Sequence, residues 1–402
     1  MIHLPIRLLV ASAITISGII AAEPVVLDRL DEMTLRAGNE HVRIEAVEGH
    51  QGRALHLAFD EKCASAFAIS QVRGRPEWDQ AAGISFWVKG DGSTHCGGLQ
   101  VVWNDDYEVR YDVAFPITST AWTRVVIPWS DLIPVLGNAK GVALDPAGAH
   151  KPSQLGQLWF GKWWYWGDYA AHGYAIDDLR LEPVIAPDTA DRHPAGAPLA
   201  RVAAKLKAGQ PITMVTMGDS LTDLHHWTNR TTNWPAFFAA AAQERWHVVP
   251  TMVNPALGGT ELKQNVVLIP RWLATTPKPD LVTICFGFND WSSGMRGERF
   301  RVAMVDAIRR VRRLSDGAAD VLVIVTVPGL PLWDELGELA QAGRQAAAEE
   351  HAGLCDAYAA FQAAAKDGGR ERLYVDDHVH LSPAGQQVLA QAVLAAIAAE
   401  GR

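Results

Sequence analysis

Apolar and polar positions alternate in two different ways along this chain. From residue 25 to residue 181, short runs rich in β-branched and aromatic residues are separated by turn residues. This spacing is typical of an antiparallel β-sandwich. We expect its strands at Ala54–Phe59, Gly83–Val88, Leu99–Trp103, Tyr107–Phe115, Thr123–Ile127, Gln157–Phe160 and Tyr174–Leu181.

From residue 199 onward, continuous apolar runs alternate with segments of helical periodicity. Strands buried on both faces have such continuous runs, so this half predicts an α/β domain with helices on both sides of a central parallel sheet. Ser382 and Pro383 suit the start of the last helix, as N-cap and first helical residue. The expected strands are Ile212–Met217, Val248–Val253, Leu281–Phe286 and Val321–Val327, and the expected helices are Trp234–Arg245, Arg299–Leu314, Leu336–His351 and Pro383–Ala399.

A proline-rich segment separates the two patterns. Four prolines lie between residues 183 and 198, which is typical of a semi-extended spacer. The chain length of 402 residues also suits two domains. We therefore predict a β-sandwich at residues 23–185, a linker at 186–198 and an α/β domain at 199–402.

Residues 1–22 have the features of a secretory signal peptide. Arg7 precedes an apolar run from Leu8 to Ile20, and two alanines follow. A membrane anchor is the less favoured alternative, because the run is shorter than the roughly 20 residues that a spanning helix needs. We expect a secreted or periplasmic protein without stable membrane insertion.

Polar motifs follow three of the predicted strands of the α/β domain, and a fourth precedes its last helix. They are Gly218–Thr222 (GDSLT), Asn254–Thr260 (NPALGGT), Gly287–Asp290 (GFND) and Asp376–Pro383 (DDHVHLSP). Ligands of such domains bind at the carboxyl ends of the parallel strands. The four motifs therefore predict one site at that edge of the sheet.

In this order, the motifs resemble those of the SGNH/GDSL hydrolase superfamily, over residues 210–400. The resemblance implies a three-layer, flavodoxin-like α/β fold and hydrolysis of esters without a metal or other cofactor. It implies that Ser220 is the nucleophile and that Asp377 and His380 complete a catalytic triad. It also implies an oxyanion hole at Ser220, Gly259 and Asn289.

The chemistry of acyl transfer supports this triad. A serine hydroxyl is a weak nucleophile unless a base takes its proton, and a carboxylate must orient that base. His378 is the rival base and Asp376 the rival carboxylate. Asp377 and His380 are favoured because only this pair has the DxxH spacing.

The oxyanion hole needs preorganised donors for the charge that develops on the carbonyl oxygen. Backbone N–H groups of Ser220 and Gly259 and the amide of Asn289 can supply three. Ala256 stands where the family often has glycine, and Gly258 is a rival donor to Gly259.

The N-terminal half resembles the galactose-binding-like jelly rolls of carbohydrate-binding modules. The segments GISFWVKGDGS, TRVVIPWSDL and YAIDDLRLEP carry this resemblance. It implies a jelly-roll sandwich, with Asp177 and Asp178 as candidate ligands of a structural Ca²⁺; two solvated acids are the alternative.

Tryptophans are the candidate contacts to sugar, because flat indoles stack on sugar rings. Trp163, Trp164 and Trp166 form one group, and Trp227 follows the nucleophile. Packing in the core or between domains is the alternative for each of them.

Composition and charge limit the possible partners. The formal charge of -9 argues against nucleic-acid binding, which requires basic residues. Residues 23–198 alone have a net charge of -9, and nine of the 15 tryptophans lie between residues 78 and 166. An acidic, indole-rich domain favours a neutral glycan. Cys63 and Cys96 are the cysteines of this half and are candidates for a disulfide in an exported protein.

Our hypothesis is an exported serine esterase that removes short acyl groups, chiefly acetyl, from a polysaccharide. One alternative is a lipase, lysophospholipase or thioesterase of the same superfamily. Another is a non-catalytic glycan-binding protein with a degenerate hydrolase domain, against which the complete set of motif residues argues.

Overall fold

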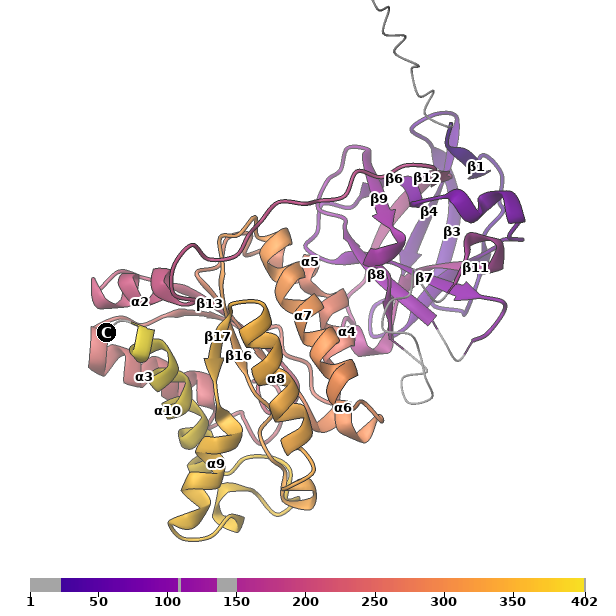
Figure 1. Cartoon of the computed structure of the whole chain (residues 1–402). Helices are drawn as coiled ribbons and strands as arrows, with labels where there is room; N and C mark the ends of the chain where they lie inside the picture. The colour runs from indigo at the N-terminus through magenta and orange to yellow at the C-terminus, as the bar shows by residue number, and fades with distance from the viewer. Residues whose placement is uncertain (1–22, 108–109, 136–149, 401–402) are drawn as a thin grey trace, which may run out of the picture.

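The computed structural model describes residues 23–107, 110–135 and 150–400. The predicted signal peptide at residues 1–22 lies outside these ranges. Two antiparallel sheets form the N-terminal half, and a parallel sheet between two layers of helices forms the C-terminal half (Figure 1). The predicted fold classes of both halves are confirmed.

Each sheet of the N-terminal jelly roll has six strands. One has the order β3-β4-β12-β6-β9, with β1 paired to β12, and the other has the order β10-β8-β7-β11-β5-β2. Their bounds are β1 Val25–Asp28, β2 Arg36–Ala37, β3 Val42–Glu48, β4 Arg53–Phe59, β5 Ala66–Gln71, β6 Gly83–Gly90, β7 Cys96–Trp103, β8 Arg110–Pro116, β9 Thr123–Pro128, β10 Ile133–Pro134, β11 Leu155–Lys162 and β12 His172–Glu182.

Alternating residues of the two sheets meet in the core of the sandwich. In β6, Phe86 points inward, and its ring meets the rings of Phe115 and Phe160 edge to face, with centroids 5.2 and 5.4 Å away. Full burial of such a side chain stabilises the fold by about 1.5–3 kcal/mol. The sandwich therefore has a hydrophobic core of its own between its two sheets.

The C-terminal sheet has five parallel strands in the order β14-β13-β15-β16-β17. In chain order this is 2-1-3-4-5, the flavodoxin-like arrangement, whose ligands bind where β13 and β15 lead the chain to opposite sides. The strands are β13 Thr213–Gly218, β14 Thr251–Val253, β15 Leu281–Cys285, β16 Asp320–Ile324 and β17 Gly353–Cys355. The helices are α2 Ala200–Lys207, α3 Trp234–Trp246, α4 Leu262–Val267, α5 Ile269–Leu273, α6 Phe288–Ser292, α7 Gly297–Leu314, α8 Gly337–Glu349, α9 Ala357–Lys366 and α10 Pro383–Glu400.

The two faces of this sheet bury different helices. Met214 and Leu322 face a core shared with α2, α3, α9 and α10. Val215 and Val323, their neighbours in the strands, face a core shared with α4, α5, α7 and α8. Neighbouring residues of a strand point to opposite faces, so the continuous apolar runs of the sequence are explained by burial on both sides.

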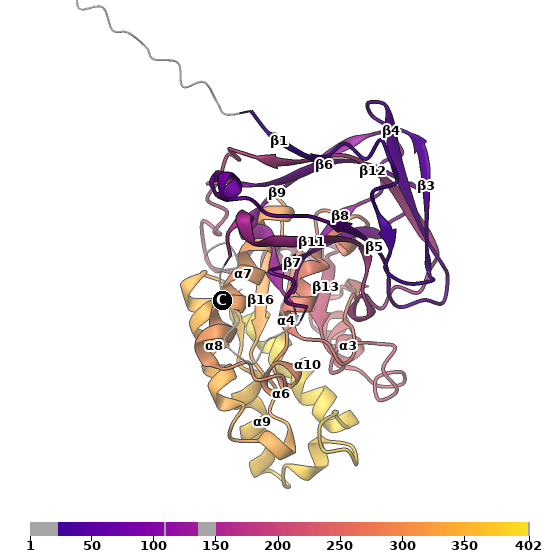
Figure 2. The same cartoon turned by 90° about the vertical axis from the view of Figure 1, so that its right-hand side faces the viewer.

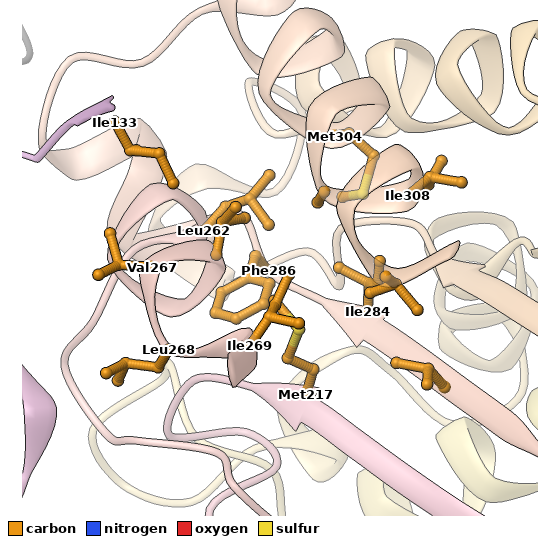
Figure 3. Close-up of a cluster of buried hydrophobic side chains, with 14 of the residues drawn as sticks. Ile133, Met217, Leu262, Val267, Leu268, Ile269, Ile284, Phe286, Met304 and Ile308 are labelled. Atoms are coloured by element: carbon orange, nitrogen blue, oxygen red, sulfur yellow. The ribbon is translucent and has the colours of Figure 1, made fainter. Parts of the chain in front are cut away.

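The second core continues into the jelly roll. The sheet that contains β7, β8 and β11 faces the C-terminal half (Figure 2). Ile133 of β10 lies in one cluster with Leu262, Val267 and Met304 (Figure 3). The two halves therefore share a hydrophobic core.

Polar contacts reinforce this interface. Two guanidinium nitrogens of Arg310 in α7 donate to the carbonyl oxygens of Asp131 and Ser130, at 3.1 and 3.0 Å. Arg313 pairs with the Asp131 carboxylate at 2.9 Å.

Within the described residues, no helix is long and apolar enough to cross a membrane.

Candidate active site

The turn after β13 presents Ser220. The Asp219 carbonyl accepts the N–H groups of Thr222 and Asp223, and its carboxylate accepts the N–H of Leu221 at 2.9 Å. These bonds close a tight turn in which Ser220 is 9% exposed. Burial raises the pKa of Asp219 to about 6.

Ser220, His380 and Asp377 form a continuous hydrogen-bonded chain. His380 Nε2 lies 2.9 Å from Ser220 Oγ, and His380 Nδ1 lies 2.7 Å from Asp377 Oδ2. The other carboxylate oxygen of Asp377 accepts the N–H groups of Val379 and His380, at 2.9 and 2.8 Å. Burial raises the pKa of Asp377, but these hydrogen bonds outweigh it and hold the pKa below its usual value. The carboxylate is therefore ionised and fixed against the imidazole.

The rival base, His378, does not take the position beside Ser220. His378 is exposed, has a φ of 63°, and donates its N–H to the Val375 carbonyl. His380 occupies the position beside Ser220. The geometry thus agrees with the DxxH spacing.

Gly259 and Gly258 differ in the use of their N–H groups. The N–H of Gly258 donates to Asp223 Oδ2 at 3.0 Å. The N–H of Gly259 has no acceptor within the part of the chain that the structure describes. Gly259 has a φ of 76°, a conformation that glycine adopts without steric cost. Of the two glycines, Gly259 has the N–H that remains available to a ligand.

Asn289 lies in the first turn of α6. Its Nδ2 donates to the Thr260 carbonyl at 3.0 Å, which leaves the second amide hydrogen for a ligand. Gly287 precedes this turn with a φ of 150°, and an added Cβ would lie 2.3 Å from Thr326 Oγ1. The GFND motif therefore needs its glycine for steric reasons.

Two buried amide side chains hold the turn that contains Ser220, the nucleophile turn, in place. Asn229 Nδ2 donates to the carbonyls of Ser220 and Asp223, at 2.7 and 2.8 Å. Gln386 Nε2 donates to Asn229 Oδ1 at 2.8 Å, and Gln386 Oε1 accepts the N–H of Trp234. Sequence reasoning missed both residues, because neither belongs to a recognisable motif.

A second histidine and a tryptophan lie beside the triad. The His226 ring stacks on the His380 ring, with centroids 4.2 Å apart and planes 25° apart. Burial and the nearby charge of His380 lower the pKa of His226. Trp227 is 60% exposed, with its ring centroid 6.4 Å from that of His380. Trp227 therefore offers an open indole face at the edge of the site.

The other predicted sugar contacts need correction. Trp163 and Trp166 are 4% and 0% exposed, and they pack in the core shared by the two halves. Their rings have no free face for a sugar, so that prediction was wrong for both. Trp164 is 53% exposed, and its contact with sugar stays a prediction.

The predicted Ca²⁺ ligands are engaged within the protein. Asp177 Oδ2 accepts the N–H groups of His50 and Gln51, at 2.7 and 3.1 Å, and Asp178 pairs with Arg180 at 2.7 Å. The Ca²⁺ site stays a prediction.

Among the described residues, the ligand atoms of His95, Asp168 and His172 come within 4.8 Å of one another. The Asp168 oxygen that lies 2.7 Å from His95 is also 3.6 Å from the Arg271 guanidinium. A cation at that distance opposes a divalent ion, so we interpret the cluster as a buried ion pair between the halves.

Cys63 and Cys96 are buried and not bonded to each other. Cys63 Sγ instead donates to the Ser65 carbonyl at 2.8 Å.

Residues 216–388 match the GDSL-like Lipase/Acylhydrolase family. This region of the chain is therefore similar to that family. The match includes the end of β13, which leads into Ser220, and the loop that carries Asp377 and His380. The C-terminal half, from here on the hydrolase half, is therefore a carboxylic ester hydrolase.

Other comparisons concern solved structures and curated proteins. Axe2, an acetylxylan esterase from Geobacillus stearothermophilus, is 21% identical with a TM-score of 0.39, over 46% of this chain and 94% of its own. The lipase/acylhydrolase from Enterococcus faecalis is 17% identical with a TM-score of 0.39, over 47% of this chain and 96% of its own. A family 11 carbohydrate-binding module from Clostridium thermocellum is 13% identical with a TM-score of 0.34, over 41% of this chain and 98% of its own. No curated protein matches the chain significantly.

Proposed function

We propose that the protein is an exported serine esterase that removes short acyl groups, chiefly acetyl, from a polysaccharide. The observation that carries the proposal is the chain of contacts from Ser220 Oγ through His380 to Asp377, at 2.9 and 2.7 Å. Residues 1–22, with their signal-peptide pattern, are the reason to include export.

In the first half of the reaction, His380 Nε2 takes the proton of Ser220 Oγ as the oxygen attacks the ester carbonyl carbon. Asp377 stabilises the imidazolium that forms. The negative charge on the carbonyl oxygen is met by the N–H groups of Ser220 and Gly259 and by the Asn289 amide. The intermediate then collapses, His380 gives its proton to the sugar oxygen, and the sugar leaves.

In the second half, His380 takes a proton from water, whose oxygen attacks the acyl carbon bound to Ser220. Collapse of the second intermediate returns the proton to Ser220 Oγ and releases the carboxylic acid. Each donor to the oxyanion acts in both halves. Removal of one such donor costs about 2.7–4 kcal/mol of transition-state stabilisation.

Trp227 supports a carbohydrate substrate. Its indole is 60% exposed beside His380, so a sugar ring that stacks on it has its acyl group near the triad. The net charge of -9 over residues 23–198 favours a neutral polymer over a polyanionic one.

The test is release of acetate from acetylated xylan and acetylated glucomannan, compared with hydrolysis of 4-nitrophenyl esters of C2 and C12 acids. We expect acetate release from at least one polymer, a preference for the C2 ester, and loss of both activities in Ser220→Ala. A preference for the C12 ester, with no acetate release, would instead support a lipase or thioesterase.

A further inference from the structure

The first turn of α6 holds the loop that carries Gly259. Asn289 Nδ2 donates to the Thr260 carbonyl at 3.0 Å, and the next residue, Asp290, accepts the N–H of Leu262 through Oδ1 at 3.1 Å. Two adjacent side chains thus bind one short segment at both of its ends. This segment follows directly on Gly259.

Other bonds make the same segment rigid. Thr260 Oγ1 donates to the Leu257 carbonyl at 2.6 Å and accepts from Asn265 Nδ2 at 2.7 Å. The N–H of Glu261 donates to Gln264 Oε1 at the start of α4. These bonds join the segment to the start of α4, and the contacts from Asn289 and Asp290 join it to α6.

Asp290 is unusual among these groups because it is a fully buried carboxyl. Its Oδ2 has no hydrogen-bond partner within the described residues. The charged groups that face it are Glu261 and Lys263 from the bound segment and α4, and Asp219 from the nucleophile turn. Burial, and then the charge of Glu261, raise the pKa of Asp290 to about 8.

We propose that Asp290 is a positioning residue of the esterase reaction, whose carboxyl holds the segment at Thr260–Leu262 on α6 and so fixes Gly259 relative to Asn289. The inference rests on the proposed function, because it assigns the oxyanion to these two donors. The Asp of the GFND motif thereby acts on the transition state through its neighbours, without contact to the substrate.

The state of Asp290 that performs this role is the protonated one. A neutral carboxyl still accepts the Leu262 N–H, whereas an ionised carboxylate in a buried position near Glu261 is costly. Loss of the proton as pH rises above about 8 strengthens the bond to the Leu262 N–H, but it also places a second negative charge near Glu261 of the segment, and this larger repulsion favours a shift of the segment away from α6. Oxyanion stabilisation should therefore weaken on the alkaline side.

Two substitutions of Asp290 separate the effect of its acceptor oxygen from the effect of its titration. Asp290→Asn keeps an acceptor oxygen and a neutral side chain of the same size. Asp290→Ala removes the acceptor and leaves the Leu262 N–H unpaired. On 4-nitrophenyl acetate at pH 7, we expect kcat to fall about 100-fold in Asp290→Ala and less than about fivefold in Asp290→Asn, with KM within about threefold of wild type in both.

The pH profile supplies a readout that a purely structural role would not change. In wild type, kcat should decline above about pH 8 as Asp290 loses its proton. In Asp290→Asn this decline should be absent or displaced to higher pH, because the amide does not titrate. An unchanged alkaline limb in Asp290→Asn overturns the proposal, and so does a kcat within threefold of wild type in Asp290→Ala.

Asp320→Ala is the matched control. Asp320 is also a buried carboxyl that accepts a backbone N–H, from Val202 at 2.9 Å, but it lies at the start of β16, the opposite end of the strand from the site. We expect lower stability with an unchanged kcat per folded molecule. If Asp290→Ala does not fold, the pH profile of Asp290→Asn decides.

Wild type and Ser220→Ala are measured alongside. Absence of ester hydrolysis in wild type, or full activity in Ser220→Ala, counts against the proposed function itself. An active wild type, an inactive Ser220→Ala and a wild-type-like Asp290→Ala count against the positioning role alone.

Discussion

Ser220 depends on buried polar groups that do not react. Asn229 is 1% exposed and holds two carbonyls of the nucleophile turn, and Gln386 orients Asn229 from α10. The order of the four motifs along the strands predicted Ser220, Asp377 and His380, and the structure brings these three side chains into one hydrogen-bonded chain. The motifs gave no sign of this support, because a buried amide is defined by its distant partners.

We expect Asn229→Ala to lower both stability and kcat. The substitution leaves the carbonyls of Ser220 and Asp223 without their side-chain donor, and an unsatisfied buried group costs about 1–3 kcal/mol. Urea unfolding and kcat on 4-nitrophenyl acetate measure the two effects. Asn39→Ala is the control, because Asn39 donates to a single carbonyl, that of Ser65 in the jelly roll. Equal losses of kcat in the two variants would contradict a specific role for Asn229.

Asp219 predicts a pH dependence of stability. Its pKa is raised to about 6 in the folded protein, so the folded state binds more protons than the unfolded state between about pH 4 and pH 6. Its contribution to the free energy of unfolding is complete at low pH and is lost as pH rises to about 6, by about 3 kcal/mol at most. The difference in unfolding free energy between wild type and Asp219→Asn should fall over this interval. A difference independent of pH would contradict the raised pKa.

His226 should affect the base on which it stacks. In His226→Ala the His380 ring loses one packed face and gains freedom to leave Ser220. We expect a fall in kcat of about tenfold, on the scale of a loosened catalytic geometry. His226→Phe keeps a flat ring and should recover much of the loss. No recovery by the phenylalanine variant would indicate that the imidazole nitrogens, and not the stacking, are important.

The helices and strands that could be predicted were those with a strong local pattern of apolar and polar residues. The helices at α3, α7, α8 and α10 were predicted to within two residues at each end, and β13 and β15 to within one. Five strands of the jelly roll were missed, the short strands β1, β2 and β10 and the longer strands β3 and β5. β3 has the sequence VRIEAVE, in which charged residues interrupt the apolar ones, and β5 contains small residues that carry little signal. Their strand character comes from pairing with β4 and with β11, which is a property of the folded chain.

The turn between β15 and α6 offers a test of how α6 is held. In Gly287→Ala the new Cβ meets Thr326 at 2.3 Å, so the start of α6 must shift and Asn289 with it. We expect a loss of about 2–4 kcal/mol in unfolding free energy and a lower kcat. Gly209→Ala is the control, since Gly209 also has a positive φ, of 68°, but has no atoms within 4 Å of an added Cβ. A Gly287→Ala variant no worse than Gly209→Ala would show that α6 is not fixed at this turn.

In the whole molecule, one hydrophobic core continues from the hydrolase half into the jelly roll, which also has a core of its own. Trp163 and Trp166 were predicted as sugar contacts, but tryptophan is common both in sugar-binding sites and in buried interfaces. In this protein both residues lie in the interface. Only the folded arrangement separates these roles, since it shows which indole faces are covered. The richness of the N-terminal half in tryptophan thus serves packing in part.

The shared core predicts cooperative unfolding. Calorimetry of residues 23–402 should give one transition, with equal calorimetric and van't Hoff enthalpies. A chain of residues 186–402 alone would expose the apolar face of α4 and α5, and we expect it to aggregate or to unfold at a lower temperature. Two separate transitions in the full chain, with an unaltered midpoint for residues 186–402, would contradict a shared core.

In the proposed reaction, His380 activates Ser220, whose Oγ attacks the acyl carbon. Mass spectrometry of peptides after reaction with a fluorophosphonate tests this activation most directly, because such a probe captures an activated serine and leaves a covalent adduct. We predict one adduct, on Ser220, which His380→Ala abolishes while the variant stays folded. Full esterase activity without an adduct on Ser220, or an undiminished adduct in His380→Ala, would contradict the account.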